Sequence, residues 1–105
     1  MKLYDFYRLF HGLLNKFPKN EKYTLGQTIE QTTLDIIKDI FACSSPERLV
    51  RKSYLNSASV KLDLLKLLVR LAYDIKTINQ GAYLRTQTLL QEIGRMLGGW
   101  IRSIK

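Results

Sequence analysis

The long segment between Pro46 and Gly81 constrains the fold most, because it contains neither glycine nor proline between those two residues. Its apolar residues recur at three- and four-residue spacing, which is typical of a helix that lies on a core. They form two rows on neighbouring faces of this helix. The rows are Ala58, Leu62, Leu65, Val69 and Ala72, and then Leu64, Leu68, Leu71, Ile75 and Ile78. Two rows predict either a helix surrounded by several neighbours or one that also contacts another subunit.

Three other segments show the same helical spacing, and residues typical of helix ends separate them. The predicted helices cover residues 3–16, 24–42, 46–78 and 82–104. No run with a period of two is long enough for a strand. The sequence therefore predicts an all-α fold, an antiparallel up-and-down four-helix bundle with short loops, in a single domain over residues 1–105.

The residues at the two ends of the third predicted helix suit its boundaries. Ser45 could cap the helix, with Pro46 at its first position. Alternatively, Ser44 and Glu47 could form a capping box. Gly81 suits the left-handed residue beyond the far end of the helix.

The last predicted helix contains the stretch IGRMLGGW (93–100), in which glycine occupies three positions. Each glycine in a helix interior costs about 1 kcal/mol relative to alanine. The apolar row of this helix continues beyond the glycines, so we predict that the helix continues too; the alternative is that Gly98 and Gly99 begin to fray its end. In a continuous helix the glycines form a smooth strip against which another backbone can pack. The residues that we predict to face a subunit seam are Gly94, Gly98 and Trp100.

Positive charge is concentrated in the second half of the chain. The chain has 17 basic and 9 acidic residues and a net charge of +8. Residues 44–105 hold eleven of the basic residues and four of the acidic ones, a net of +7. Such an excess suggests a polyanionic partner, either nucleic acid or an anionic membrane. A basic face that only aids solubility is the other interpretation left open.

Several of these cations share helix faces, as Lys66 and Arg70 do at a spacing of four, and Arg95 and Arg102 at a spacing of seven. Rows of cations on rigid helices suit contacts to phosphates. No zinc-finger, ribonucleoprotein or helix-turn-helix pattern accompanies them, so sequence-tolerant binding is the expected mode. The candidates for nucleic-acid or polymerase binding are Arg48, Arg51, Lys52, Lys66, Arg70, Arg85, Arg95 and Arg102.

The sequence offers little to a catalyst or to a metal. His11 and Cys43 are single residues of their kinds, so no metal-ligand pair and no internal disulfide can form from them. We interpret the acidic residues of the second predicted helix as a solvated face; they are Glu30, Asp35 and Asp39. We expect no catalytic residue, no cofactor and no metal, and hence no enzyme.

The most apolar segment, residues 62–73, is too short and too charged to span a bilayer. The first residues lack a long uninterrupted apolar core, so we expect no signal peptide and no membrane partner. A single unpaired cysteine suits a reducing cytoplasm, which is the expected location.

Three longer stretches resemble one known family. EIGRMLGGW (92–100), FPKNEKYTLGQTIEQTTLDII (17–37) and LVRKSYLNSASVKLDLLKLLVRLAYDIKTIN (49–79) are similar to segments of the accessory variability determinant proteins of diversity-generating retroelements. These proteins lie within a broader four-helix-bundle family that is linked to ribosomal RNA intervening sequences. The resemblance covers nearly the whole chain.

The resemblance implies a four-helix bundle that assembles into a homopentameric barrel with a positively charged surface. It also implies a prokaryotic or phage-encoded protein that binds RNA or DNA and the element's reverse transcriptase. Together the two proteins would support cDNA synthesis from the template-repeat RNA and mutagenic retrohoming. The alternative function is that of a four-helix-bundle protein associated with ribosomal RNA or the ribosome, and a further one is that of a purely structural oligomer.

Overall fold

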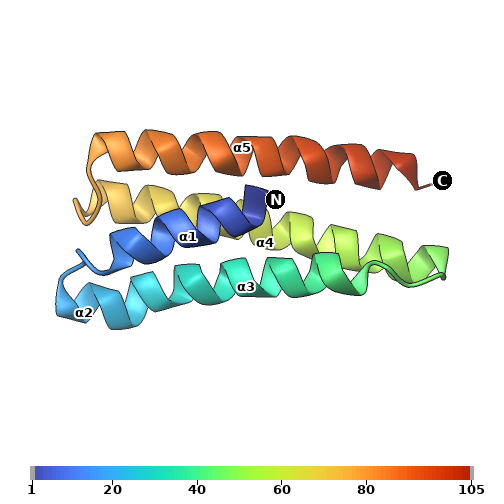
Figure 1. The fold of residues 1–105 in the computed structure, drawn as a ribbon, viewed down its shortest axis with the longest axis horizontal. Coiled ribbons are helices and arrows are strands. Elements are labelled where there is room, and N and C mark those ends of the chain that lie inside the picture. The colour runs from blue at the N-terminus through green and yellow to red at the C-terminus, as the bar shows by residue number, and fades with distance from the viewer. Residues whose placement is uncertain (1, 105) are drawn as a thin grey trace.

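The computed structural model describes residues 2–104, and every regular element within them is helical (Figure 1). Three elements, α2, the π-helical segment η1 and α3, follow one another without a break and form one rod. The chain thus builds four antiparallel rods. The elements are α1 (Lys2–Leu14), α2 (Lys19–Glu21), η1 (Lys22–Gly26), α3 (Gln27–Ala42), α4 (Arg48–Asp74) and α5 (Gln80–Ser103). The prediction of an all-α bundle of four helices is confirmed for this part of the chain.

The rods pack in a ring, with α1 on α3, α3 on α4, α4 on α5 and α5 on α1. The bundle measures 44 × 22 × 19 Å, and α4 and α5 run along most of its long axis (Figure 1). The shorter α1 begins near the middle of that axis and covers only one half of the bundle (Figure 1). The other half is therefore built from α3, α4 and α5 alone.

The core contains the apolar rows that the spacing predicts. All five residues of the first α4 row are buried, from Ala58 to Ala72. They meet Leu90, Ile93 and Leu97 of α5 and a row of α1 residues. Burial of each large side chain contributes about 1.5–3 kcal/mol relative to exposure. The α1 row consists of Leu3, Phe6, Phe10 and Leu14.

The second α4 row lies mostly outside the core. Leu64, Leu71 and Ile75 are 45%, 46% and 45% exposed, whereas Ile78 is buried. Within this protomer, the other helices therefore do not cover both apolar rows of α4. The other interpretation of the two rows, a contact with another subunit, stays a prediction.

The second rod begins five residues earlier than predicted, at Lys19 instead of residue 24. The chain passes from α2 into the π-helical turn η1, whose last residue, Gly26, is buried. A Cβ atom at Gly26 would collide with Leu14 Cδ1 and lie 3.2 Å from Phe17 Cδ2. This close approach of the end of α1 explains why a glycine stands here.

Both ends of α4 differ from the prediction of residues 46–78. The helix begins at Arg48, because Glu47 has an extended backbone, and no side chain caps it. The Glu47 N–H instead bonds to Ser45 Oγ, 3.3 Å away, so neither predicted cap forms.

The far end of α4 also comes earlier than predicted, at Asp74. Lys76 has a φ of 65° and takes the left-handed position expected of Gly81, which lies within α5. The Asn79 side chain accepts a bond from Ala82 N at 2.8 Å and so caps α5. The α4–α5 connection thus depends on Lys76 and Asn79 and not on a glycine.

The last helix continues through its glycines, as predicted, but runs from Gln80 to Ser103 instead of over residues 82–104. None of the helices within residues 2–104 has both the length and the apolar character that crossing a bilayer requires.

Candidate functional site

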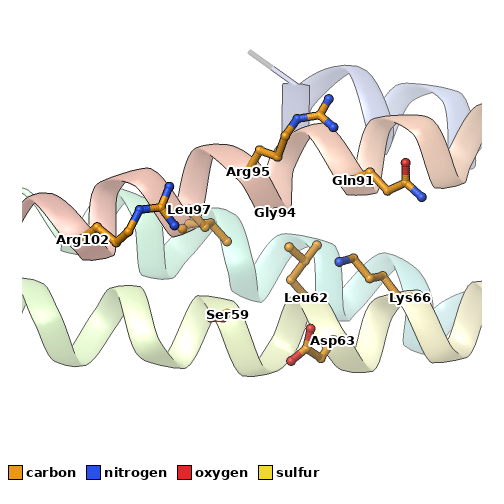
Figure 2. Close-up of a pocket in the computed structure, with 10 residues that line it drawn as sticks. Ser59, Leu62, Asp63, Lys66, Gln91, Gly94, Arg95, Leu97 and Arg102 are labelled. Atoms are coloured by element: carbon orange, nitrogen blue, oxygen red, sulfur yellow. The ribbon is translucent and has the colours of Figure 1, made fainter.

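An open groove lies between α4 and α5 on the half of the bundle near the α5 C-terminus (Figure 2). Its volume is about 590 Å³. Leu62 and Leu97 are buried at its base and join the two helices to the core. The residues that line the groove are Ser59, Leu62, Asp63, Lys66, Gln91, Gly94, Arg95, Leu97, Gly98 and Arg102.

Two glycines of α5, Gly94 and Gly98, keep the groove open. They stand one helical turn apart, on the side of α5 that borders α4. A Cβ atom at Gly94 would lie 3.4 Å from Lys66 Nζ, and one at Gly98 would lie 3.3 Å from Arg102 Nη1. The two cationic ends therefore lie directly over the two glycines. Helical side chains lean toward the N-terminus of their helix, which explains why Arg102 covers the residue one turn before it.

The groove carries more positive than negative charge. Lys66 reaches from α4 toward α5, and Arg102 runs back along α5 toward Leu97 (Figure 2). Arg95 stands on α5 and points away from α4, whereas Asp63 lies on α4 (Figure 2). Within residues 2–104 no carboxylate forms an ion pair with any of the three cations. Three of the eight predicted cations thus come together at one site.

Arg70 is engaged within the protein, at the other end of the α4–α5 pair. Its Nε lies 3.0 Å from Asp74 Oδ1, and its guanidinium lies 5.9 Å and 5.8 Å from the rings of Tyr73 and Tyr83. These two rings stack with their centroids 4.4 Å apart. The Tyr83 side chain, and after it Asp74, raises the pKa of Arg70. Arg70 therefore holds the helix ends together and is less available to a partner.

The other four predicted cations lie outside the groove. Arg51 donates from Nη1 to the carbonyl oxygens of Pro46, at 2.8 Å, and Ser45, at 3.3 Å, and so holds the α3–α4 loop. Arg48 and Lys52 are exposed in the first turns of α4. Arg85 is exposed near the start of α5, and its spacing of nine residues from Gly94 places it on the opposite side of that helix.

Trp100 does not lie beside the glycine strip. It follows Gly98 by two residues, which rotates it about 200° around the helix axis. Its side chain is 40% exposed and borders a small apolar crevice with Leu3, Ile40 and Met96. The three residues predicted to share a seam thus lie on two different sides of α5.

The acidic residues also differ from the solvated face that we predicted. Asp39 is buried, and its Oδ2 lies 2.9 Å from Lys61 Nζ, so that α3 and α4 are joined by an ion pair. Glu30 is half-buried and accepts a hydrogen bond from the Tyr7 hydroxyl at 3.0 Å. The solvated-face prediction is wrong for these two residues, because their partners come from other helices.

His11 lies 3.2 Å from the same Glu30 carboxylate, through its Nδ1 atom, and is exposed. Cys43 is half-buried. Sequence spacing shows Tyr7 and His11 one turn apart but cannot reveal that both face Glu30. No group of three potential metal ligands occurs within the described residues.

The remaining feature that the spacing revealed only in part is a row of exposed apolar residues along α4. Val60 and Leu67 are 69% and 65% exposed, and three residues of the second predicted row continue the surface. We call this surface the α4 apolar row. Its members are Val60, Leu64, Leu67, Leu71 and Ile75.

A comparison with protein-family models gives a match to one family, described as bAvd-like, over residues 1–104. The chain belongs to the bAvd-like family. Comparisons with curated proteins and with solved structures gave no significant match. The family assignment agrees with the resemblance to accessory variability determinant proteins, and it extends over nearly the whole chain.

Proposed function

We propose that this chain is a non-catalytic accessory protein of a diversity-generating retroelement. In this function it binds nucleic acid and the element's reverse transcriptase and supports cDNA synthesis from the template-repeat RNA, and so mutagenic retrohoming. The observation that carries the proposal is the match to the bAvd-like family over residues 1–104. The polymerisation chemistry would belong to the partner enzyme.

The distribution of charge supports a role as a docking surface. Four of the nine acidic residues form ion pairs with Lys or Arg within residues 2–104, as Glu92 does with Lys2 at 2.9 Å and Asp74 with Arg70. Within residues 2–104, six of the eight candidate cations take part in no such ion pair and make none of the backbone contacts of Arg51. These six are available to phosphates or to acidic side chains of a polymerase. They are Arg48, Lys52, Lys66, Arg85, Arg95 and Arg102.

Assembly is part of the same proposal, and the resemblance suggests a homopentamer. The α4 apolar row supports contact with a second copy of the chain, because interfaces between permanent subunits are more apolar than other protein surfaces. Leu67, 65% exposed, lies at the centre of this row. No member of this row is among the residues that line the groove, so the two are separate surfaces of the described chain.

Co-expression with the reverse transcriptase encoded beside the gene tests this function. We expect the polymerase and nucleic acid to co-purify with the tagged chain. We also expect its mass in solution to be several times the protomer mass. A variant with Arg48, Lys52, Lys66 and Arg95 changed to Glu should no longer bind the polymerase, the nucleic acid, or either of them. The matched control reverses four cations of the other half of the chain, Arg8, Lys16, Lys19 and Lys22.

The proposal fails if the first variant keeps both partners, or if the wild-type chain retains neither. A gene neighbourhood without a reverse transcriptase and a repeat pair would favour the alternative association with ribosomal RNA.

A further inference from the structure

The α4–α5 groove combines a concave shape with cations that no other part of the described chain neutralises. Lys66 and Arg102 extend over its floor, and Arg95 stands at its rim (Figure 2). Asp63, the one carboxylate among the described residues that line the groove, forms no ion pair with any of the three cations. Lys66 and Arg102 have no carboxylate partner within residues 2–104, so an anion in the groove would pair with charges that are otherwise uncompensated.

The two glycines on the floor of the groove lower the stability of α5, and the packing of the protomer does not require them. A Cβ atom at Gly94 would meet Lys66 Nζ at 3.4 Å and Leu62 Cδ2 at 3.6 Å, and one at Gly98 would meet only Arg102 Nη1. These are mostly the mobile ends of long side chains, which can move aside. Each glycine still costs about 1 kcal/mol in a helix. The packing of the protomer therefore gives no reason for two glycines here, whereas close approach of an external group does.

We infer that this groove holds the sugar–phosphate backbone of a nucleic-acid strand, with Lys66 and Arg102 on successive phosphates and the glycines beneath them. The inference rests on the proposed nucleic-acid function and assigns it to one site.

Gly94 and Gly98, near which the two cationic ends lie, are four residues apart, or about 6 Å along the helix axis. This separation is comparable to that of neighbouring phosphates along a strand. Ser59 and Gln91 add neutral hydrogen-bond donors at the same site.

The groove is suited to the backbone and not to the bases. No aromatic side chain is among the residues that line it, so it provides no surface on which a base can stack. Lys and Arg contacts to phosphates position a strand without selecting its sequence. Binding at this groove should therefore tolerate any sequence and weaken steeply with salt.

A second copy of this chain is a poorer occupant of the groove. The copy would also carry a charge of +8, and the cores of protein interfaces are depleted of lysine. The α4 apolar row offers a better surface for self-association. The prediction that Gly94 and Gly98 face a subunit seam is therefore the competing interpretation, and the experiments below separate the two.

The first experiment removes the groove charges. The double variant Lys66→Gln, Arg102→Gln is compared with a control double variant, Lys16→Gln, Lys19→Gln. The control also removes two exposed cations, but they lie in the first twenty residues, outside α4 and α5. The measurement is fluorescence anisotropy with a labelled RNA–DNA duplex over a range of salt concentrations. We expect the groove variant alone to bind roughly tenfold more weakly, with a slope of log K against log salt that is reduced by about 1.8, or about 0.9 per lost phosphate contact.

Equal losses in both double variants would show that binding depends on diffuse charge, which overturns the assignment of the site while the proposed function stands. Loss of polymerase binding with unchanged duplex binding would assign the groove to an acidic segment of the polymerase and also overturn the inference. If the wild-type chain binds no duplex at low salt, both the inference and the proposed nucleic-acid function fail.

The second experiment fills the groove without changing any charge. In the double variant Gly94→Leu with Gly98→Leu, the new side chains occupy the floor between Lys66 and Arg102. Leucine favours a helix more than glycine does, so the variant should fold. We expect duplex binding to fall at least tenfold while circular dichroism and the mass in solution stay unchanged. A changed mass would support the seam and overturn the inference, as would unchanged duplex binding.

Discussion

Gly26 and the pair Gly94 and Gly98 occupy similar positions, inside long helical rods, but the structure explains only the first. At Gly26, Leu14 at the end of α1 and Phe17 in the loop after it lie against the backbone, and a side chain would not fit. At Gly94 and Gly98 the space outside the helix is open apart from Leu62 and the ends of two cationic side chains. Packing within the protomer therefore explains Gly26. A contact with a group outside the protomer would explain Gly94 and Gly98.

The largest effect should come from Gly26→Ala. The new Cβ would collide with Leu14 Cδ1, which is buried, and overpacking of this kind costs about 1–3 kcal/mol. We expect the free energy of unfolding to fall by that amount in urea denaturation followed by circular dichroism. An unchanged midpoint would show that the end of α1 can move aside, and the contrast between the two glycine sites would disappear.

The double variant Gly94→Ala, Gly98→Ala should be more stable than the wild type, in contrast to Gly26→Ala. Only Lys66, Leu62 and Arg102 lie within 4 Å of the new Cβ atoms, so the gain in helix propensity should dominate. The free energy of unfolding should rise by up to about 2 kcal/mol, or about 1 kcal/mol per glycine. Gly99→Ala is the matched control, because nothing lies within 4 Å of its Cβ position. A loss of stability in the double variant, but not in the control, would mean that the protomer itself requires these glycines.

A smaller effect is expected at the contact between α1 and the helix that Gly26 enters. The Tyr7 hydroxyl donates to Glu30 Oε2 at 3.0 Å, and Tyr7→Phe should lower the free energy of unfolding at pH 7 by up to about 1 kcal/mol. The bond to Glu30, followed by burial, raises the pKa of Tyr7 above its ordinary value of 10.0. A raised pKa in the folded state means that this stabilisation is complete below pH 10 and is lost as the pH rises through the raised value.

The test of this contact is urea denaturation of both proteins at pH 7 and above pH 10. The difference between wild type and Tyr7→Phe should shrink at the higher pH. A difference that stays constant would show that the hydroxyl contributes through packing and not through its bond to Glu30.

Much of the fold follows from local spacing. The first row of α4 identifies the buried face of that helix, since Leu62 and Leu65 are buried, whereas its second row lies mostly outside the core. The ends of the helices were less predictable. Pro46 is a good first helical residue, but the loop before α4 stays extended to Glu47. Such ends depend on contacts like that of Arg51 with Pro46, which bring a helix and a loop together.

The candidate site was predictable in kind but not in place. Spacing selected eight cations, and the structure brings three of them, Lys66, Arg95 and Arg102, to one groove. It also shows that Arg70 is taken up by Asp74 and two tyrosines. No pattern within a single helix distinguishes these cases, because each depends on which residue of the neighbouring helix lies opposite.

The sequence by itself determined that the chain forms long helices, which faces of them are apolar, and that the second half carries most of the positive charge. These properties depend on residues only a few positions apart, and helical geometry translates such spacings directly into faces. Only the tertiary structure decided which cations keep a free charge, where Asp39 finds Lys61, and which glycines the core requires. These properties are set by the distances between residues on different helices, and packing alone determines them.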